Sequence, residues 1–308
     1  QVQHNVVIGA SAMNSTGSDA QTGVVAIGSS ALTAMTSGGS ATSGNVAIGY
    51  QAAATITDGS SNISIGYQAM ASSHTTSTQN VVVGRAAMQN STGSASNNNT
   101  GIGHGIFGGT MNAASDNVAV GHSALGSLTT GDYNVAMGKE AGAGITTGGE
   151  NVVIGYNAGD SFDAESQNVL IGSGSGGNAS FAAGSCVAIG AGTLEGAATV
   201  DGSVAVGKNA LNALTSGSGN TAIGFQSGTT LTSTASNTYL GYRAGRYNVG
   251  AKNVYIGHTS GEGTSSGTYS GEENVGAGYQ SLAALTTGDN NIAIGSLTAD
   301  AMTTGERN

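Results

Sequence analysis

The octapeptide NVAIGYQA at residues 45–52 decides the fold, because variants of it recur along the whole chain. Its first five residues (Asn, Val, small, Ile, Gly) return as 5–9, 62–66, 117–121, 151–155, 220–224 and 291–295. Aligned on the last residue of this core, seventeen copies end at Gly9, Gly28, Gly49, Gly66, Gly84, Gly103, Gly121, Gly138, Gly155, Gly172, Gly190, Gly207, Gly224, Gly241, Gly257, Gly278 and Gly295. The spacings are 16 to 21 residues, most often 17. A short fixed period of this kind indicates a solenoid whose units bury a core only when stacked.

The composition argues against a conventional enzyme core. Of 308 residues, 54 are Gly, none is Pro or Trp, and only 8 % are charged, whereas an ordinary soluble domain carries about 25 % charged residues. A disordered low-complexity chain is the first alternative, and the periodic placement of Val and Ile rejects it. We therefore expect one continuous repeat array over residues 1–308 and no enzymatic activity.

Charge and hydropathy narrow the partners. The net charge of −10 repels phosphate backbones, so nucleic acid is not an expected partner. No stretch approaches about 18 consecutive apolar residues, so we expect no membrane insertion. Cys186 is the only cysteine, which excludes an intrachain disulfide. The sequence suggests no cofactor and no metal.

The five-residue core predicts a short strand that is apolar on both faces. Val46 and Ile48 share one face because side chains alternate along a strand, and Ala47 lies on the other. Strands that are dry on both faces belong to parallel sheets covered on both sides. One face is then the interior of the coil, and the other needs a further part of the chain or another chain.

A second pattern follows each glycine, as in HSAL at residues 122–125 and KNAL at residues 208–211. Its apolar spacing would suit one helical turn. Six copies, however, have glycine at the fourth residue after the core glycine: Gly142, Gly159, Gly176, Gly228, Gly245 and Gly261. Glycine inside a helix costs about 1 kcal/mol. We therefore favour a second short strand or a bend, with a mini-helix as the alternative.

Stacked copies predict an all-β parallel β-solenoid or β-roll of about seventeen coils. At about 4.8 Å for each coil the array would span roughly 80 Å. The glycine at each strand end allows a positive φ at the corner. The recurring asparagine is expected to form an amide ladder along the axis, with these members: Asn45, Asn62, Asn80, Asn117, Asn134, Asn151 and Asn168.

Three copies depart from the asparagine, which is kept in the other fourteen. Val24, Cys186 and Ser203 replace it. Cys186 is therefore expected to be a small buried side chain rather than a catalytic thiol. Asn308 lies 17 residues beyond Asn291 and begins an eighteenth copy, so we expect the chain to be a segment of a longer array.

The sequence NVAIGYQA and its echoes at 151–158 and 220–227 resemble the repeats of phage tail fibres. They are also similar to the head repeats of trimeric autotransporter adhesins, which are shorter, near fourteen residues. The resemblance implies a homotrimer, intertwined or side by side, in which the second apolar strand face packs against neighbouring subunits. It covers essentially the whole chain and does not separate phage from bacterial owners.

Large polar or aromatic residues often follow the core glycine, and five tyrosines among them are candidates for contact with surface glycans: Tyr50, Tyr67, Tyr156, Tyr242 and Tyr279. The alternative, which we favour, is that these amphipathic side chains cover the strand edge or a subunit boundary.

Two groups of residues have side chains of the kind that bind metals, but neither group is expected to form a metal site. His104 and His122 occupy matching places in adjacent copies, but a metal would need further ligands. The acidic residues that precede the core asparagine are interpreted as solvated turn charges rather than calcium ligands.

These observations lead to two functional hypotheses. The first is a tail-fibre segment in a virion, a homotrimer that binds a host cell-surface glycan or protein receptor and joins other fibre or baseplate proteins. The second is a bacterial trimeric adhesin, extracellular and on the cell surface, that binds matrix or cells. An ice-binding or carbohydrate-processing solenoid is disfavoured, because a flat Thr-x-Thr rank and clustered acids are both missing.

Overall fold

The computed structural model describes residues 4–14, 21–35, 43–72, 74–91, 94–177, 184–196, 199–265 and 269–308. In these ranges the chain forms seventeen three-residue strands and no helix. The strands are β1 (Val6–Ile8), β2 (Val25–Ile27), β3 (Val46–Ile48), β4 (Ile63–Ile65), β5 (Val81–Val83), β6 (Thr100–Ile102), β7 (Val118–Val120), β8 (Val135–Met137), β9 (Val152–Ile154), β10 (Val169–Ile171), β11 (Val187–Ile189), β12 (Val204–Val206), β13 (Thr221–Ile223), β14 (Thr238–Leu240), β15 (Val254–Ile256), β16 (Val275–Ala277) and β17 (Ile292–Ile294). The predicted all-β parallel solenoid with a spacing of about 17 residues is confirmed.

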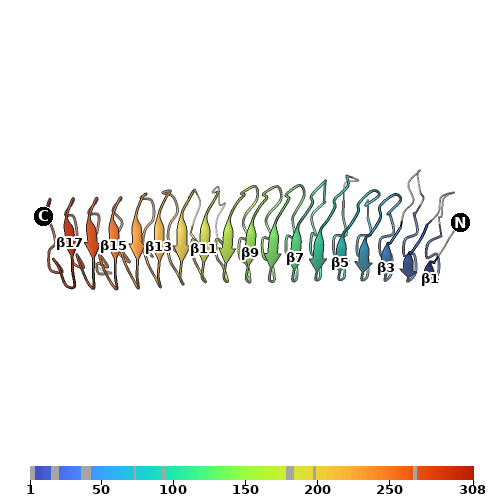
Figure 1. The fold of residues 1–308 in the computed structure, drawn as a ribbon, viewed down its shortest axis with the longest axis horizontal. Coiled ribbons are helices and arrows are strands. Elements are labelled where there is room, and N and C mark those ends of the chain that lie inside the picture. Colours follow the sequence, from blue (N-terminus) through green and yellow to red (C-terminus); the bar gives the residue numbers. More distant parts are fainter. Residues whose placement is uncertain are drawn as a thin grey trace. The chain divides into compact units, whose positions relative to one another are not determined.

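The chain divides into two compact units, Gln1–Val153 and Ile154–Asn308, and β9 spans the boundary. In the first unit, each strand from β1 to β8 pairs in parallel with the next. In the second, β10 to β17 do the same. Within each unit the strands lie side by side in chain order and point the same way (Figure 1). The prediction of one array over 1–308 stays a prediction.

Pairing joins equivalent positions, so side chains of one kind form rows. Between β7 and β8, Ala119 faces Ala136 and Val120 faces Met137. The middle residue of the strand points into the coil, and Ala119 and Ala136 are fully buried. The two outer residues point away from the interior and are partly or largely exposed along the strands. In these two coils the interior therefore takes the small residue, and the larger aliphatic residues lie outside.

Each coil encloses a thin apolar layer. In the coil that begins at Asn117, the buried side chains are Ala119, Ala124, Leu125 and Leu128, all without solvent exposure. One coil of this size buries too little apolar surface to fold alone, and the next coil covers it.

The segment after the strand glycine consists of turns. The N–H of Ala52 donates to the Gly49 carbonyl over 3.3 Å, and the N–H of Ile56 donates to Ala53 over 3.3 Å. Gln51 and Ala53 have φ values of 53° and 50°. Left-handed residues at alternate positions cannot continue a right-handed helix. The predicted bend is confirmed, and a second strand is represented only by isolated bridges among the described residues, as at Thr22 and Ser43.

The left-handed position also explains the six glycines noted in the sequence. Where Leu125 has a φ of 49°, Gly142 has 59°, and Gly228, Gly245 and Gly261 have similar values. Large side chains fill the space above several of these glycines. A Cβ on Gly245 would lie 2.7 Å from the ring of buried Tyr239. In such coils, glycine makes room for a tyrosine at the inward strand position.

Candidate functional site

The outer face of each sheet is an aliphatic surface, formed by the first and third residues of the strands. Its most exposed members are 36 to 73 % accessible: Val6, Ile8, Ile102, Met137, Ile189, Ile223, Leu240, Ile256, Ile292 and Ile294. Exposed apolar side chains in contiguous rows often mark an interaction surface, and parallel sheets are normally covered on both faces. This outer aliphatic face is the strongest candidate for an interface in each unit.

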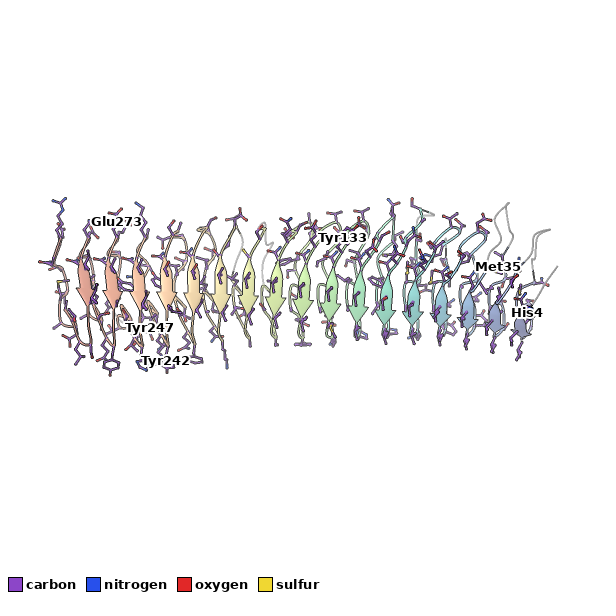
Figure 2. The ribbon with its side chains drawn as sticks, viewed as in Figure 1. His4, Met35, Tyr133, Tyr242, Tyr247 and Glu273 are labelled. Atoms are coloured by element: carbon purple, nitrogen blue, oxygen red, sulfur yellow. The ribbon has the colours of Figure 1, made fainter. Side chains whose placement is uncertain are left out.

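A second surface follows the strand ends, where one residue after each strand glycine projects from the edge of the sheet. We call it the aromatic row; its aromatic members in the described coils are Tyr50, Tyr67, His104, His122, Tyr156, Phe225, Tyr242, His258 and Tyr279. In the second unit, Tyr242 lies at the edge where the strands end, and Glu273 lies at the opposite edge (Figure 2). The five predicted tyrosines are 39 to 53 % exposed.

Rings in the aromatic row stack on one another along the solenoid. The Tyr50 and Tyr67 centroids are 5.2 Å apart. The Tyr242 ring lies between Phe225 at 5.5 Å and His258 at 4.8 Å. Neighbouring rings therefore cover the two faces of Tyr242, so a ligand there meets ring edges and hydroxyl groups. Glycan contact by these tyrosines stays a prediction.

Charged side chains flank this stack in the second unit. The Arg243 guanidinium lies 5.0 Å from the Tyr242 ring centroid, and its Nε donates to Gln226 over 3.2 Å. Arg243 and Arg246 each approach Glu262 to 3.9 Å. Burial raises the pKa of the Glu262 carboxyl, and the two arginines oppose that shift. The cluster fixes the side chains beside the row.

The asparagines at the strand starts are buried and hydrogen-bonded in series. In the first unit, Nδ2 of each donates to Oδ1 of the preceding one over 3.0 to 3.1 Å, through Asn45, Asn62, Asn80, Asn99, Asn117, Asn134 and Asn151. The same Oδ1 atoms also accept the next backbone N–H, as Asn117 does from Asn134 at 2.9 Å. Of the seven predicted members, Asn168 lies in the second unit, where its Oδ1 accepts the N–H of Cys186 at 3.0 Å.

The ladder changes chemistry where asparagine is replaced. Cys186 is buried, and its thiol lies 3.3 Å from the Val200 carbonyl oxygen. Burial raises the pKa of the Cys186 thiol, which keeps it protonated. Ser203 Oγ accepts the N–H of Asn220 at 3.2 Å, so a hydroxyl preserves one bond of the ladder.

The residue types considered as metal ligands have other contacts. The His104 and His122 rings stack at 5.0 Å, and the Arg85 guanidinium lies 3.3 Å from His104 Nε2. Asp132 accepts the N–H of Ser115 at 2.7 Å, and Asp289 accepts that of Glu272 at 2.8 Å. The described residues hold no group of three or more His, Cys, Asp or Glu that could bind a metal.

A hollow of about 180 Å³ interrupts the aromatic row of the second unit, and sequence reasoning missed it. Seven residues from three successive coils line it: Tyr156, Asn157, Asp160, Ser173, Gly174, Gly177 and Glu195. The signal in the sequence is the pair Ser173-Gly174, which stands where other coils carry Tyr-Gln, as at 50–51, 67–68 and 279–280.

A buried histidine was also missed. His74 takes the interior place that Leu128 and Leu214 hold in other coils, and its Nε2 lies 2.6 Å from the Met88 carbonyl oxygen. Burial lowers the pKa of His74 to about 4, against an opposing effect of that hydrogen bond. The ring is therefore neutral at physiological pH and acts as part of the core.

In the ranges that the structure describes, no helix is long and apolar enough to span a membrane. A scan against protein-family models finds no match to this chain, and a search of curated proteins finds no significant match.

Proposed function

We propose that this chain is a segment of a homotrimeric attachment fibre, and that the fibre is a phage tail fibre that carries a virion to its host surface. The observation that carries the proposal is the outer aliphatic face, which a lone chain leaves in water over successive strands. Burial of apolar surface contributes roughly 25 cal/mol for each Å², so this face favours association.

Second copies of the same chain are the occupant that fits this face best. Parallel pairing repeats the same two outer positions from coil to coil, as Val118 and Val120 align with Val135 and Met137. A partner with the same repeat matches the rows along their full length, whereas a non-repeating surface matches only locally. A dimer would also cover the face; the number three rests on the resemblance to trimeric fibres.

Attachment is the role that a fibre of repeated coils would serve, and the fibre would join further fibre or baseplate proteins. A bacterial trimeric adhesin is the alternative, because its Ala-Ile-Gly repeats resemble those at 47–49 and 188–190. The two proposals share the assembly and differ in location, virion or bacterial cell surface, and in target.

The molar mass in solution tests the assembly. We expect three times the 29.6 kDa of one chain in light scattering coupled to size exclusion. The double variant Val118→Asp/Val120→Asp on the outer face should release monomers that keep the circular dichroism of the wild type. Tyr133→Asp, an exposed change at the opposite edge from the aromatic row, is the matched control and should stay trimeric. A folded wild-type monomer at micromolar concentration would overturn the trimer.

A binding experiment distinguishes the phage tail fibre from the bacterial adhesin. Labelled trimer should adsorb to intact cells of a bacterial panel if the fibre belongs to a phage, and to matrix proteins or animal cells if it belongs to an adhesin. Adsorption to neither class, by a trimer of correct mass, would contradict an attachment role for this segment.

A further inference from the structure

The hollow beside Tyr156 lies where the coil after Gly172 has small residues in the places that hold Tyr-Gln in other coils, such as 50–51 and 67–68. Ser173 and Gly174 occupy the first and second places after the strand glycine Gly172, and Gly177 occupies the fifth. A Cβ built on Gly174 would meet nothing within 4 Å. Three small residues in one coil thus open a gap between a coil with Tyr156 and Asp160 and a coil with Glu195.

We propose that this hollow binds a single neutral pyranose unit of a glycan. The inference rests on the proposed attachment function and assigns part of the recognition to one built site within one chain. The volume of about 180 Å³ is suited to one sugar ring rather than an oligosaccharide.

The spacing of the lining residues suits a pyranose. Asp160, Gly177 and Glu195 hold equivalent places in three successive coils, so the backbone positions that carry the two carboxylates lie about two strand spacings, roughly 10 Å, apart. A ring placed over Gly177 lies between them and can donate hydroxyl hydrogen bonds to both sides. Glu195 is held in place by Asn212, whose Nδ2 donates to Oε2 at 2.8 Å.

Tyr156 and Asn157 supply the remaining wall. An aromatic ring offers its π surface to the C–H face of a sugar, and Tyr156 borders the hollow next to Ser173 rather than another aromatic residue. Asn157 Oδ1 is buried and accepts no hydrogen bond from the described residues. Rotation about the soft χ2 torsion turns this amide toward a ligand hydroxyl.

The same chemistry disfavours other occupants. Two carboxylates repel phosphates and acidic sugars. Within the described ranges Asp160 and Glu195 belong to no group of three or more His, Cys, Asp or Glu that could bind a metal. A small organic cation would satisfy the carboxylates and the tyrosine, but it would leave the amide of Asn157 without a hydroxyl partner. The experiment below therefore includes a small organic cation as a probe.

Saturation-transfer NMR with the whole chain tests the proposal. The probes are methyl glycosides of glucose, galactose, mannose and N-acetylglucosamine, with N-acetylneuraminic acid and tetramethylammonium for comparison, at concentrations well into the millimolar range. We expect at least one neutral glycoside to bind, with the strongest saturation on the protons of one ring face, and both charged probes to bind at least tenfold more weakly.

Three variants localise the signal. Tyr156→Ala should weaken binding at least tenfold. Ser173→Tyr/Gly174→Gln should abolish it, because this change restores the Tyr-Gln pair of other coils, where Gln51, Gln68 and Gln280 adopt φ values of 53° to 55°, close to the 64° of Gly174. Tyr133→Ala, which removes an exposed ring at the edge opposite the aromatic row, is the control and should bind like the wild type.

Several results would overturn the site: no neutral probe binds, tetramethylammonium alone binds, or the filled variant with wild-type melting retains binding. The molar mass measured on the same samples keeps this test apart from that of the fibre. A trimer without sugar binding rejects only the site, and a monomer that binds sugar rejects only the assembly.

Discussion

The two edges of each sheet are built on different physical constraints. At the edge where the strands end, all seventeen core glycines have φ between 122° and 145°. A Cβ on Gly121 would lie 2.7 Å from the carbonyl carbon of Gly138. At the edge where the strands begin, the residue before the asparagine is also left-handed, but Gln79, Tyr133 and Glu150 occupy it with φ of 58° to 59°.

The difference shows two reasons for a glycine in a solenoid. The end-edge glycines are required by both backbone angle and the approach of the next coil, so no other residue replaces them in any copy. The start-edge position requires only the angle. Gly202 has a φ of 60° there with nothing within 4 Å of a built Cβ, and polar or aromatic residues accept the same angle elsewhere.

The largest expected effect comes from a substitution at the edge where the strands end. Gly121→Ala should lower the free energy of unfolding by at least about 3 kcal/mol, because a left-handed strain adds to overpacking against backbone that cannot move aside. Urea unfolding followed by circular dichroism measures it. A loss below about 1 kcal/mol would show that the coils separate easily at this edge.

Buried His74 lies between the two edges and should make the stability of the fold depend on pH. The pKa of His74 is about 4 in the fold and about 6.5 unfolded, so folding favours the neutral ring. The contribution of this neutral ring to the free energy of unfolding is therefore fully present above about pH 6.5. It is lost as the pH falls toward 4, by about 3 kcal/mol in total. His74→Leu should remove this loss, measured as the difference between variant and wild-type unfolding at pH 7 and pH 4. Parallel pH dependence of both proteins would contradict the assignment.

The start edge is expected to depend on its buried ladder rather than on its exposed turn. Asn117→Ala removes the acceptor of the Asn134 N–H and should cost about 2 kcal/mol, since a buried donor is left unsatisfied. Asn117→Ser should cost less, because Ser203 already performs this role for Asn220. Thermal unfolding ranks the variants, and equal losses for Ala and Ser would refute the role of the acceptor.

The smallest expected effect is at the exposed part of the start edge. Gly202→Ala should cost about 1 kcal/mol or less, the ordinary penalty of a left-handed alanine in open space. It is the matched control for Gly121→Ala in the same assay. Equal losses at the two positions would remove the distinction between the edges.

Particular residues show how far the sequence predicts this molecule. The positive φ of Gly49 was expected from its place at a strand end, and it is confirmed at 134°. The close contact of each such glycine with the next coil could not be predicted from the sequence, because this contact depends on the distance between the two backbones. Buried Tyr239 was also not expected, since only the fold shows that Gly228 and Gly245 leave space for its ring.

The candidate sites divide in the same way. The outer aliphatic face follows from alternation within a strand, and the tyrosines of the aromatic row follow from the repeat. The hollow does not follow, because Tyr156, Gly177 and Glu195 meet only through stacking of three coils. A one-dimensional pattern identifies what repeats, and a hollow is a departure from the repeat.

By itself the sequence determined the repeat, the strand positions, the parallel stacking of coils and the apolar character of both strand faces, because period and alternation are local properties of the chain. Only the tertiary structure decided which face turns inward, which turns are left-handed and where side chains from successive coils leave a cavity. These depend on the volumes and hydrogen bonds of groups that are about 17 residues apart in the sequence and in direct contact in space.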